Sequence, residues 1–201
     1  MLTSTGHPNQ AGTTTVGRYL ATRLAQLGAQ HLFGLPGDFN LTLLDEMLTG
    51  DGISWVGTTN ELSAAYAADG YARIGRFPAA VVTTYGVGEL SAINGIAGAF
   101  AGFDRRRRAF ASQPPRRDHS HFARMYAQVT AAQAILDPST ASREIDRVLT
   151  TALTTSKPVY LGVPLDAATA TIVRSDVAGR PTRTPPRSGT PGPRHSRMSY
   201  K

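Results

Sequence analysis

One sequence pattern limits the possible fold of this chain more than any other feature. Between residues 13 and 101, short apolar runs alternate three times with segments of helical periodicity. Residues 79–84 (AAVVTT) form a continuous apolar run, typical of a strand buried on both faces, and a glycine-rich turn and a helical stretch follow it. Such alternation predicts parallel strands joined by helical crossovers. We therefore expect an α/β fold with a mostly parallel, doubly wound sheet and helices on both faces.

The turn residues set the expected element ends. We expect a helix over 16–27 that Gly28 ends, and a strand over 31–34. A helix through residue 48 then starts with Asp38 as its N-cap, a strand covers 53–56, and Asn60 caps the next helix. In that helix Gly70 is unfavourable unless a neighbouring backbone packs closely against it. Later, a short helix begins near residue 121, a strand lies near 128–132, a helix starts at about 137–139, and a strand covers 159–163.

The alternation of strands and helices is interrupted once. After residue 101 the pattern requires an apolar strand, but the sequence has four consecutive arginines, Arg105 to Arg108, and then two prolines. We expect one central strand to be missing here. Residues 103–118 carry +4 and residues 174–201 carry +6, so that, with +7 on the whole chain, the remaining residues carry −3. Segments this rich in Arg, Pro, Ser and Thr bury too little apolar area to fold, so we expect an aberrant basic segment over 102–118 and a disordered basic tail over 175–201.

Composition excludes several classes of protein. There is no cysteine, which removes disulfides, thiol nucleophiles and cysteine-ligated zinc, and the five histidines lack metal-ligand spacing. No run approaches 18 apolar residues, so we expect no membrane partner. Residues 1–12, which we expect to be flexible, lack the basic and apolar regions of a signal peptide. A cytoplasmic location is the resulting expectation.

Three long motifs carry chemistry. They are FGLPGDFN at 33–40, NELSAAYAADGYAR at 60–73 and TTYGVGELSAIN at 83–94. The last partly fits a dinucleotide fingerprint, but Ser91 stands where the third glycine belongs, so a tight turn with close helix packing is the better interpretation. Together, in this order and spacing, the motifs closely resemble the N-terminal, pyrimidine-binding domain of thiamine-diphosphate-dependent 2-oxo acid decarboxylases, the pyruvate and indolepyruvate decarboxylase group. The resemblance covers residues 13–101 and 119–168.

The resemblance implies roles for individual residues. Glu61 matches the glutamate that hydrogen-bonds a pyrimidine ring nitrogen of the cofactor and favours its reactive tautomer. Asp38 matches the acid/base aspartate that contacts substrate. Positions that line the pyrimidine pocket are matched here by Pro36, Gly37, Thr84 and Val87. Structural roles remain as alternatives: an acid in the first helical turn suits the helix dipole, and aspartate is an ordinary N-cap.

Departures from the family pattern matter as well. The histidine pair that the family uses in proton transfer is absent, and we do not transfer its role to His119 or His121. The family's diphosphate and Mg²⁺ are held by a separate C-terminal domain, so we expect that site to be absent from this chain and place no metal ligand on it. The resemblance implies a 2-oxo acid substrate, aldehyde and CO₂ as products, and a homo-oligomer, but we expect the isolated chain to be inactive.

Two alternatives stay open. One is a non-catalytic interaction fragment that pairs with an intact homologue. The other is a basic protein that binds nucleic acid through Arg105 to Arg108 and the tail, although no series of stacking aromatic residues accompanies those charges, and we therefore expect no nucleic-acid partner. The abrupt breaks around 102–118 and 175–201 further suggest translation in a wrong frame or across a deletion, against a natural insertion and tail.

Overall fold

A computed structural model describes residues 12–50, 52–75, 77–102, 108–113 and 120–174. Its helices are α1 (Val16–Gln26), α2 (Leu41–Leu48), α3 (Glu61–Gly75), α4 (Val87–Ala101), α5 (Ser120–Tyr126) and α6 (Ala141–Thr155). Its strands are β1 (Thr13–Thr15), β2 (His31–Gly34), β3 (Ser54–Gly57), β4 (Ala79–Thr84), β5 (Arg108–Gln113), β6 (Gln133–Ile135), β7 (Tyr160–Gly162) and β8 (Thr171–Val173).

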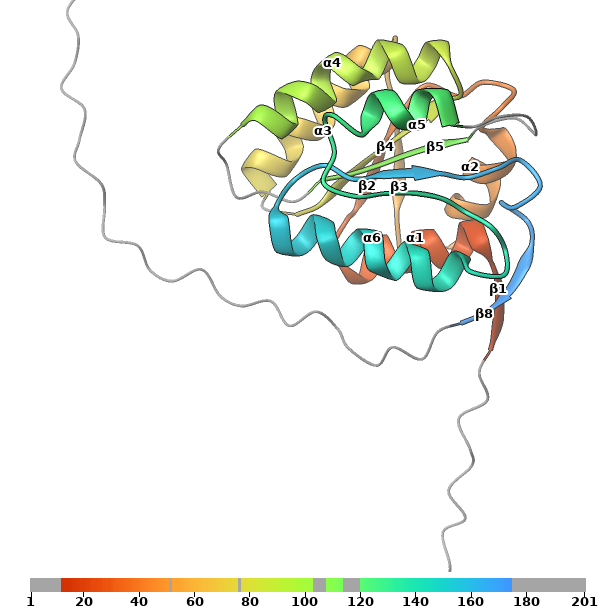
Figure 1. Cartoon of the computed structure of the whole chain (residues 1–201). Helices are drawn as coiled ribbons and strands as arrows, with labels where there is room; N and C mark the ends of the chain where they lie inside the picture. The colour runs from red at the N-terminus through yellow and green to blue at the C-terminus, as the bar shows by residue number, and fades with distance from the viewer. Residues whose placement is uncertain (1–11, 51, 76, 103–107, 114–119, 175–201) are drawn as a thin grey trace, which may run out of the picture.

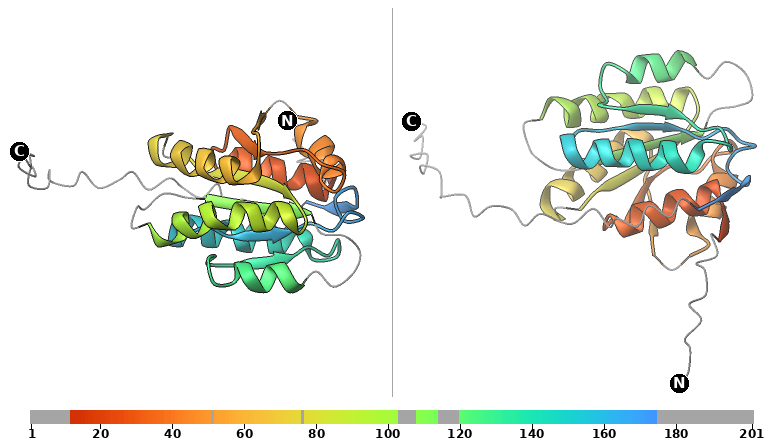
Figure 2. Two further views of the ribbon diagram at one scale, coloured as in Figure 1. Left: turned by 90° about the horizontal axis from the view of Figure 1, so that it is seen from above. Right: turned by 60° about the horizontal axis from the view of Figure 1, so that its bottom comes forward.

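Six strands form one sheet, in the order β3-β2-β4-β5-β7-β6, and every neighbouring pair is parallel. Helices cover both faces, with α3, α4 and α5 on one side and α1 and α6 on the other (Figure 1). The second view in Figure 2 brings α1 and α6 forward, where they run side by side. The predicted α/β class with a doubly wound parallel sheet is confirmed.

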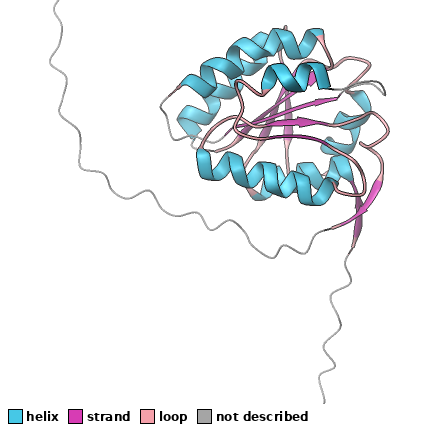
Figure 3. Cartoon of the chain, in the orientation of Figure 1, coloured by secondary structure: helices cyan, strands magenta, loops and turns pink. Residues whose placement is uncertain are grey.

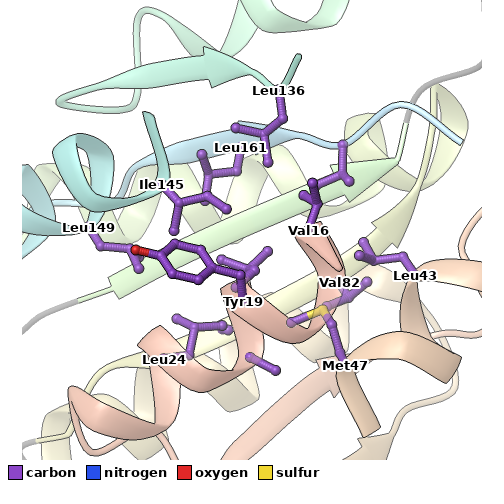
Figure 4. Close-up of a cluster of buried hydrophobic side chains, with 14 of the residues drawn as sticks. Val16, Tyr19, Leu24, Leu43, Met47, Val82, Leu136, Ile145, Leu149 and Leu161 are labelled. Carbon is purple, nitrogen blue, oxygen red and sulfur yellow. The ribbon is translucent and has the colours of Figure 1, made fainter. Parts of the chain in front are cut away.

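Each face of the sheet has its own core. The larger core packs α1, α2 and α6 against the sheet, with side chains that include Leu24, Met47, Val82, Ile145 and Leu161 (Figure 4). The opposite core is built largely from small residues of α3 and α4 and from two buried tyrosines of α5 and β7. Alternate residues of β4 enter the two cores, because successive strand side chains point to opposite faces.

The expectation of a missing central strand is wrong. Residues 108–113 form β5, which pairs with β4 on one side and with β7 on the other. Val81 of β4 is the register partner of Phe110, and Phe110 is in turn paired with Tyr160 of β7. A sheet position is occupied through backbone hydrogen bonds, which do not require the long aliphatic run that we expected there.

The expected strand over 128–132 is also wrong. Residues 127–132 form the turn that leaves α5, and the strand is β6, at Gln133–Ile135. The Oγ1 of Thr130 donates to the carbonyl of Tyr126, and the N–H of Ala131 donates to the carbonyl of Pro158. These two bonds hold the segment between the end of α5 and Pro158, just before β7, so that the pairing of β6 with β7 starts only at Gln133.

Other local predictions are confirmed. The helix α1 ends before Gly28, whose φ of +93° lies in the left-handed region that glycine tolerates best. The Oδ1 of Asn60 accepts a hydrogen bond from the N–H of Ser63, as an N-cap does. The predicted short helix near 121 is α5.

Two short strands were not expected. β1 and β8 pair antiparallel and stand apart from the main sheet (Figure 3). β8 lies beyond residue 168, where the resemblance ends. Among the described residues no helix is both long enough and apolar enough to cross a bilayer. The expectations for 1–11, for 103–107 and 114–119, and for the tail over 175–201 lie outside the described residues.

Candidate active site

The topology creates one special position on the sheet edge. The strands β2 and β4 are neighbours, but the helix after β2 packs in one core and the helix after β4 packs in the other. The two connections therefore leave the sheet in opposite directions at the carboxyl ends of these strands. In open α/β sheets, ligands bind in the crevice at such a switch point. The three motifs of the sequence all meet here.

Gly88 brings two polar side chains together. A Cβ built on Gly88 would lie 2.7 Å from the Oε1 of Glu61 and 2.5 Å from the Oγ1 of Thr84. Glu61 is the first residue of α3, Thr84 is the last residue of β4, and both side chains are half-buried. A carboxylate and a hydroxyl thus converge on a backbone that carries no side chain.

The turn after β2 closes the other side of Thr84. A Cβ on Gly37 would lie 2.7 Å from the Cγ2 of Thr84. Asn40, which is fully buried, holds this turn: its Oδ1 accepts from the N–H of Gly37, and its Nδ2 donates to the carbonyl of Leu35. Pro36 lies in the same turn with an exposed side chain.

Besides Pro36, two further predicted site residues face outward. Asp38 is exposed and does not cap α2, because Asn40 occupies the N-cap position and its side chain instead braces the preceding turn. The N-cap prediction for Asp38 is therefore wrong. Val87, in the first turn of α4, is 81% exposed, so its side chain lies on the surface beside Gly88.

The sequence analysis missed three residues of this site. Asn40 was assigned no role, and its buried amide between two loop backbone groups is visible only in the folded chain. Gly88 was noted only as a turn glycine, although the contact with Glu61 depends on it. The third is Glu89, which is completely buried. A glutamate inside a glycine-rich turn that follows a buried strand is the signal that could have identified it.

The site offers several polar groups to a ligand. Glu61 offers acceptor oxygens, Thr84 offers a hydroxyl, and the first-turn N–H groups of α4 lack intrahelical partners. Gly88 and Gly37 leave room where side chains would crowd these groups. Within the described residues, no three His, Asp or Glu side chains gather as a metal site would require.

Comparison with known proteins agrees with this geometry. Residues 14–134 match the family model described as "Thiamine pyrophosphate enzyme, N-terminal TPP binding domain". This range includes all the site residues described above and also the basic segment around β5.

Several mycobacterial proteins are similar to the chain. An alpha-keto-acid decarboxylase of Mycobacterium bovis is 44% identical over 185 residues, which cover 85% of this chain and 31% of the relative. Proteins of the same name from Mycobacterium ulcerans and Mycobacterium avium are 44% and 43% identical over the same shares. The chain thus spans less than a third of the length of these relatives.

Proposed function

The chain belongs to the family of thiamine pyrophosphate enzymes, as their N-terminal TPP-binding domain, and from this membership we propose that it holds the aminopyrimidine end of thiamine diphosphate for a non-oxidative 2-oxo acid decarboxylase. The observation that carries the proposal is the convergence of Glu61 and Thr84 over Gly88 at the switch point between β2 and β4. When bound, the cofactor supplies the electron sink that allows a 2-oxo acid to lose CO₂ and leave as an aldehyde.

Each residue of the site has a stated part in this proposal. Glu61 hydrogen-bonds a pyrimidine ring nitrogen and so biases where the ring holds its proton. Thr84 and Gly37 line the ring, with Pro36 and Val87 at its margin. We assign to Asp38, which is exposed on the turn after β2, the contact with the substrate and a proton exchange with it.

Thiamine binding tests the role of Glu61. Because the proposal gives this chain only the pyrimidine end, we expect thiamine and thiamine diphosphate to bind with affinities within a few-fold of each other in calorimetric titrations. Glu61→Gln should weaken both by about 10- to 100-fold, the range for one hydrogen bond to a charged group. Asp45→Asn, which removes an exposed carboxylate from α2, should leave both affinities unchanged. Equal affinities for the wild type and Glu61→Gln would refute the role.

Turnover is a separate question. We expect no aldehyde release from pyruvate, phenylpyruvate or indolepyruvate by the purified chain with thiamine diphosphate and Mg²⁺. The reason is that the family's diphosphate and Mg²⁺, as the resemblance implies, are held by a different domain, from a partner subunit in the homo-oligomer. Aldehyde formation by this chain alone, detected with a coupled dehydrogenase, would contradict that division of labour.

A further inference from the structure

A buried carboxylate lies directly behind the candidate active site. Glu89, in the first turn of α4, is fully buried, and both of its carboxylate oxygens are hydrogen-bonded. The Oε2 accepts from the backbone N–H of Gly86 at 2.9 Å, and the Oε1 accepts from the hydroxyl of Tyr160 at 2.7 Å. A buried carboxylate is costly unless such partners satisfy it. Its position therefore depends on both partners.

A second tyrosine extends the same group. The hydroxyl of Tyr126 donates to the backbone carbonyl of Glu89 at 2.6 Å, and the rings of Tyr126 and Tyr160 lie 5.0 Å apart. Burial, and next the nearby Glu89 carboxylate, raise the pKa of Tyr126 well above its ordinary value, so that its hydroxyl stays a donor. These contacts tie the start of α4 to α5 and to β7.

The bond to Gly86 holds the turn at the start of α4. Gly86 has a φ of +79°, in the left-handed region, and it is the N-cap of α4. Two residues farther along is Gly88, the backbone on which the Glu61 carboxylate and the Thr84 hydroxyl converge. Any movement of this turn therefore changes the space available to Glu61.

We propose that Glu89 is a positioning residue of the candidate cofactor site. Its carboxylate oxygens bond Gly86 and Tyr160, so in this proposal it acts through the turn. Instead it anchors the turn 86–88 to Tyr160 of β7 and thereby fixes the distance between Gly88 and Glu61. The proposal rests on the proposed function, because positioning matters only if Glu61 meets a ligand. It assigns to β7, far along the chain from the three motifs, a part in the geometry of the site.

Tyr160→Phe tests this anchor without changing any charge. The variant keeps the ring and removes only the hydroxyl that reaches Glu89. Tyr19→Phe is the matched control, because Tyr19 is also buried and its hydroxyl donates to a carboxylate, that of Asp146 at 2.8 Å, in the opposite core. Glu89→Gln is the second test variant, since it keeps the size of the side chain and weakens both bonds. Urea titrations give the free energy of unfolding of all three variants, so that their effects can be compared at known stability.

The first measurements report on the turn 86–88 and on Glu61 in the protein without ligand. We expect Tyr160→Phe and Glu89→Gln to speed amide hydrogen exchange at residues 86–88 by about tenfold relative to Tyr19→Phe, which corresponds to the loss of one net hydrogen bond. The carboxyl ¹³C resonance of Glu61 should also shift in Tyr160→Phe and stay unchanged in Tyr19→Phe. If Tyr160→Phe and Tyr19→Phe change the exchange at 86–88 and the Glu61 resonance equally, Glu89 is not a positioning residue.

A binding measurement separates this proposal from the one it rests on. Thiamine should bind Tyr160→Phe about tenfold more weakly than Tyr19→Phe, at comparable global stability. If the wild-type chain binds no thiamine, the proposed function fails, while the exchange and resonance data still decide whether Glu89 holds the turn. If thiamine binds and the affinity of Tyr160→Phe equals that of Tyr19→Phe, the anchor has no influence on the site and the proposal is overturned.

Discussion

At the scale of single residues, the site depends on the missing side chain of Gly88. A Cβ at this position would lie only 2.7 Å from the Oε1 of Glu61, so any residue other than glycine would crowd the carboxylate. The Glu61 carboxylate is the far end of a flexible side chain, but the Oγ1 of Thr84, 2.5 Å from the same Cβ position, belongs to a short β-branched side chain. A methyl group on Gly88 should therefore lower both the affinity for the cofactor and the stability of the fold.

The prediction concerns Gly88→Ala. We expect thiamine affinity to fall by about tenfold or more, because the hydrogen bond from Glu61 is lost, and the free energy of unfolding to fall by about 1–3 kcal/mol, because the methyl group also overpacks Thr84. Gly98→Ala is the control, since it lies in the same helix and a Cβ there would meet, in the part of the chain that the structure describes, no atom within 4 Å beyond the helix's own backbone. Calorimetry and urea unfolding give the two quantities. Wild-type affinity in Gly88→Ala would show that Glu61 does not occupy this space in solution.

At the scale of elements, α3 and α4 show two opposite uses of glycine. A Cβ on Gly95 of α4 would lie 2.6 Å from the Cβ of Ala65 in α3, so this glycine permits the close packing of the two helices. Outside its own helical backbone, no atom of the described residues lies within 4 Å of the Cβ position of Gly70 in α3. The expectation that a neighbouring backbone explains Gly70 is wrong.

Alanine at these two glycines should have opposite effects. Gly70→Ala should stabilise the protein by about 0.5–1 kcal/mol through helix propensity alone. Gly95→Ala should destabilise it by about 1–3 kcal/mol, because the added methyl group overpacks the helix contact. Urea titrations followed by circular dichroism measure both values. A stabilising Gly95→Ala would mean that α3 and α4 are farther apart than the structure has them.

At the scale of the whole molecule, β5 decides whether there is one sheet or two pieces. It joins the β3-β2-β4 half, which carries the site, to the β7-β6 half, which carries Tyr160. The proposed anchor of Glu89 therefore requires that β5 pair with both of its neighbouring strands.

We keep as a proposal that 102–118 and the tail arise from a shifted reading frame. If no family-like strand appears when the codons of 102–118 are read in the other frames, that proposal fails.

A proline in β5 tests the central strand. Ala111 is paired with Val82 of β4 and with Leu161 of β7. Ala111→Pro removes a ladder N–H from a central strand, a position that proline avoids, and should broaden or abolish the cooperative unfolding transition. Ala111→Ser keeps the N–H and serves as the control at the same position. A transition in Ala111→Pro that matches the wild type would place residues 108–113 outside the sheet.

The sequence by itself determined what local patterns can encode. The apolar run of β4, the end of α1 at Gly28 and the cap of α3 at Asn60 follow from periodicity and turn chemistry. The three motifs also carry the resemblance that points to Glu61, Thr84 and Gly37, because a family motif is a local stretch of the chain.

Only the tertiary structure decided the rest. It placed residues 108–113 in the centre of the sheet, since backbone pairing with β4 and β7 does not depend on side-chain periodicity. It moved the helix cap from Asp38 to Asn40, because the amide of Asn40 bonds two loop groups that only the folded turn brings together. It also joined Glu89 to Tyr160, across 71 positions of sequence. Local pattern carries no information about such contacts, because they form between segments that meet only when the sheet closes.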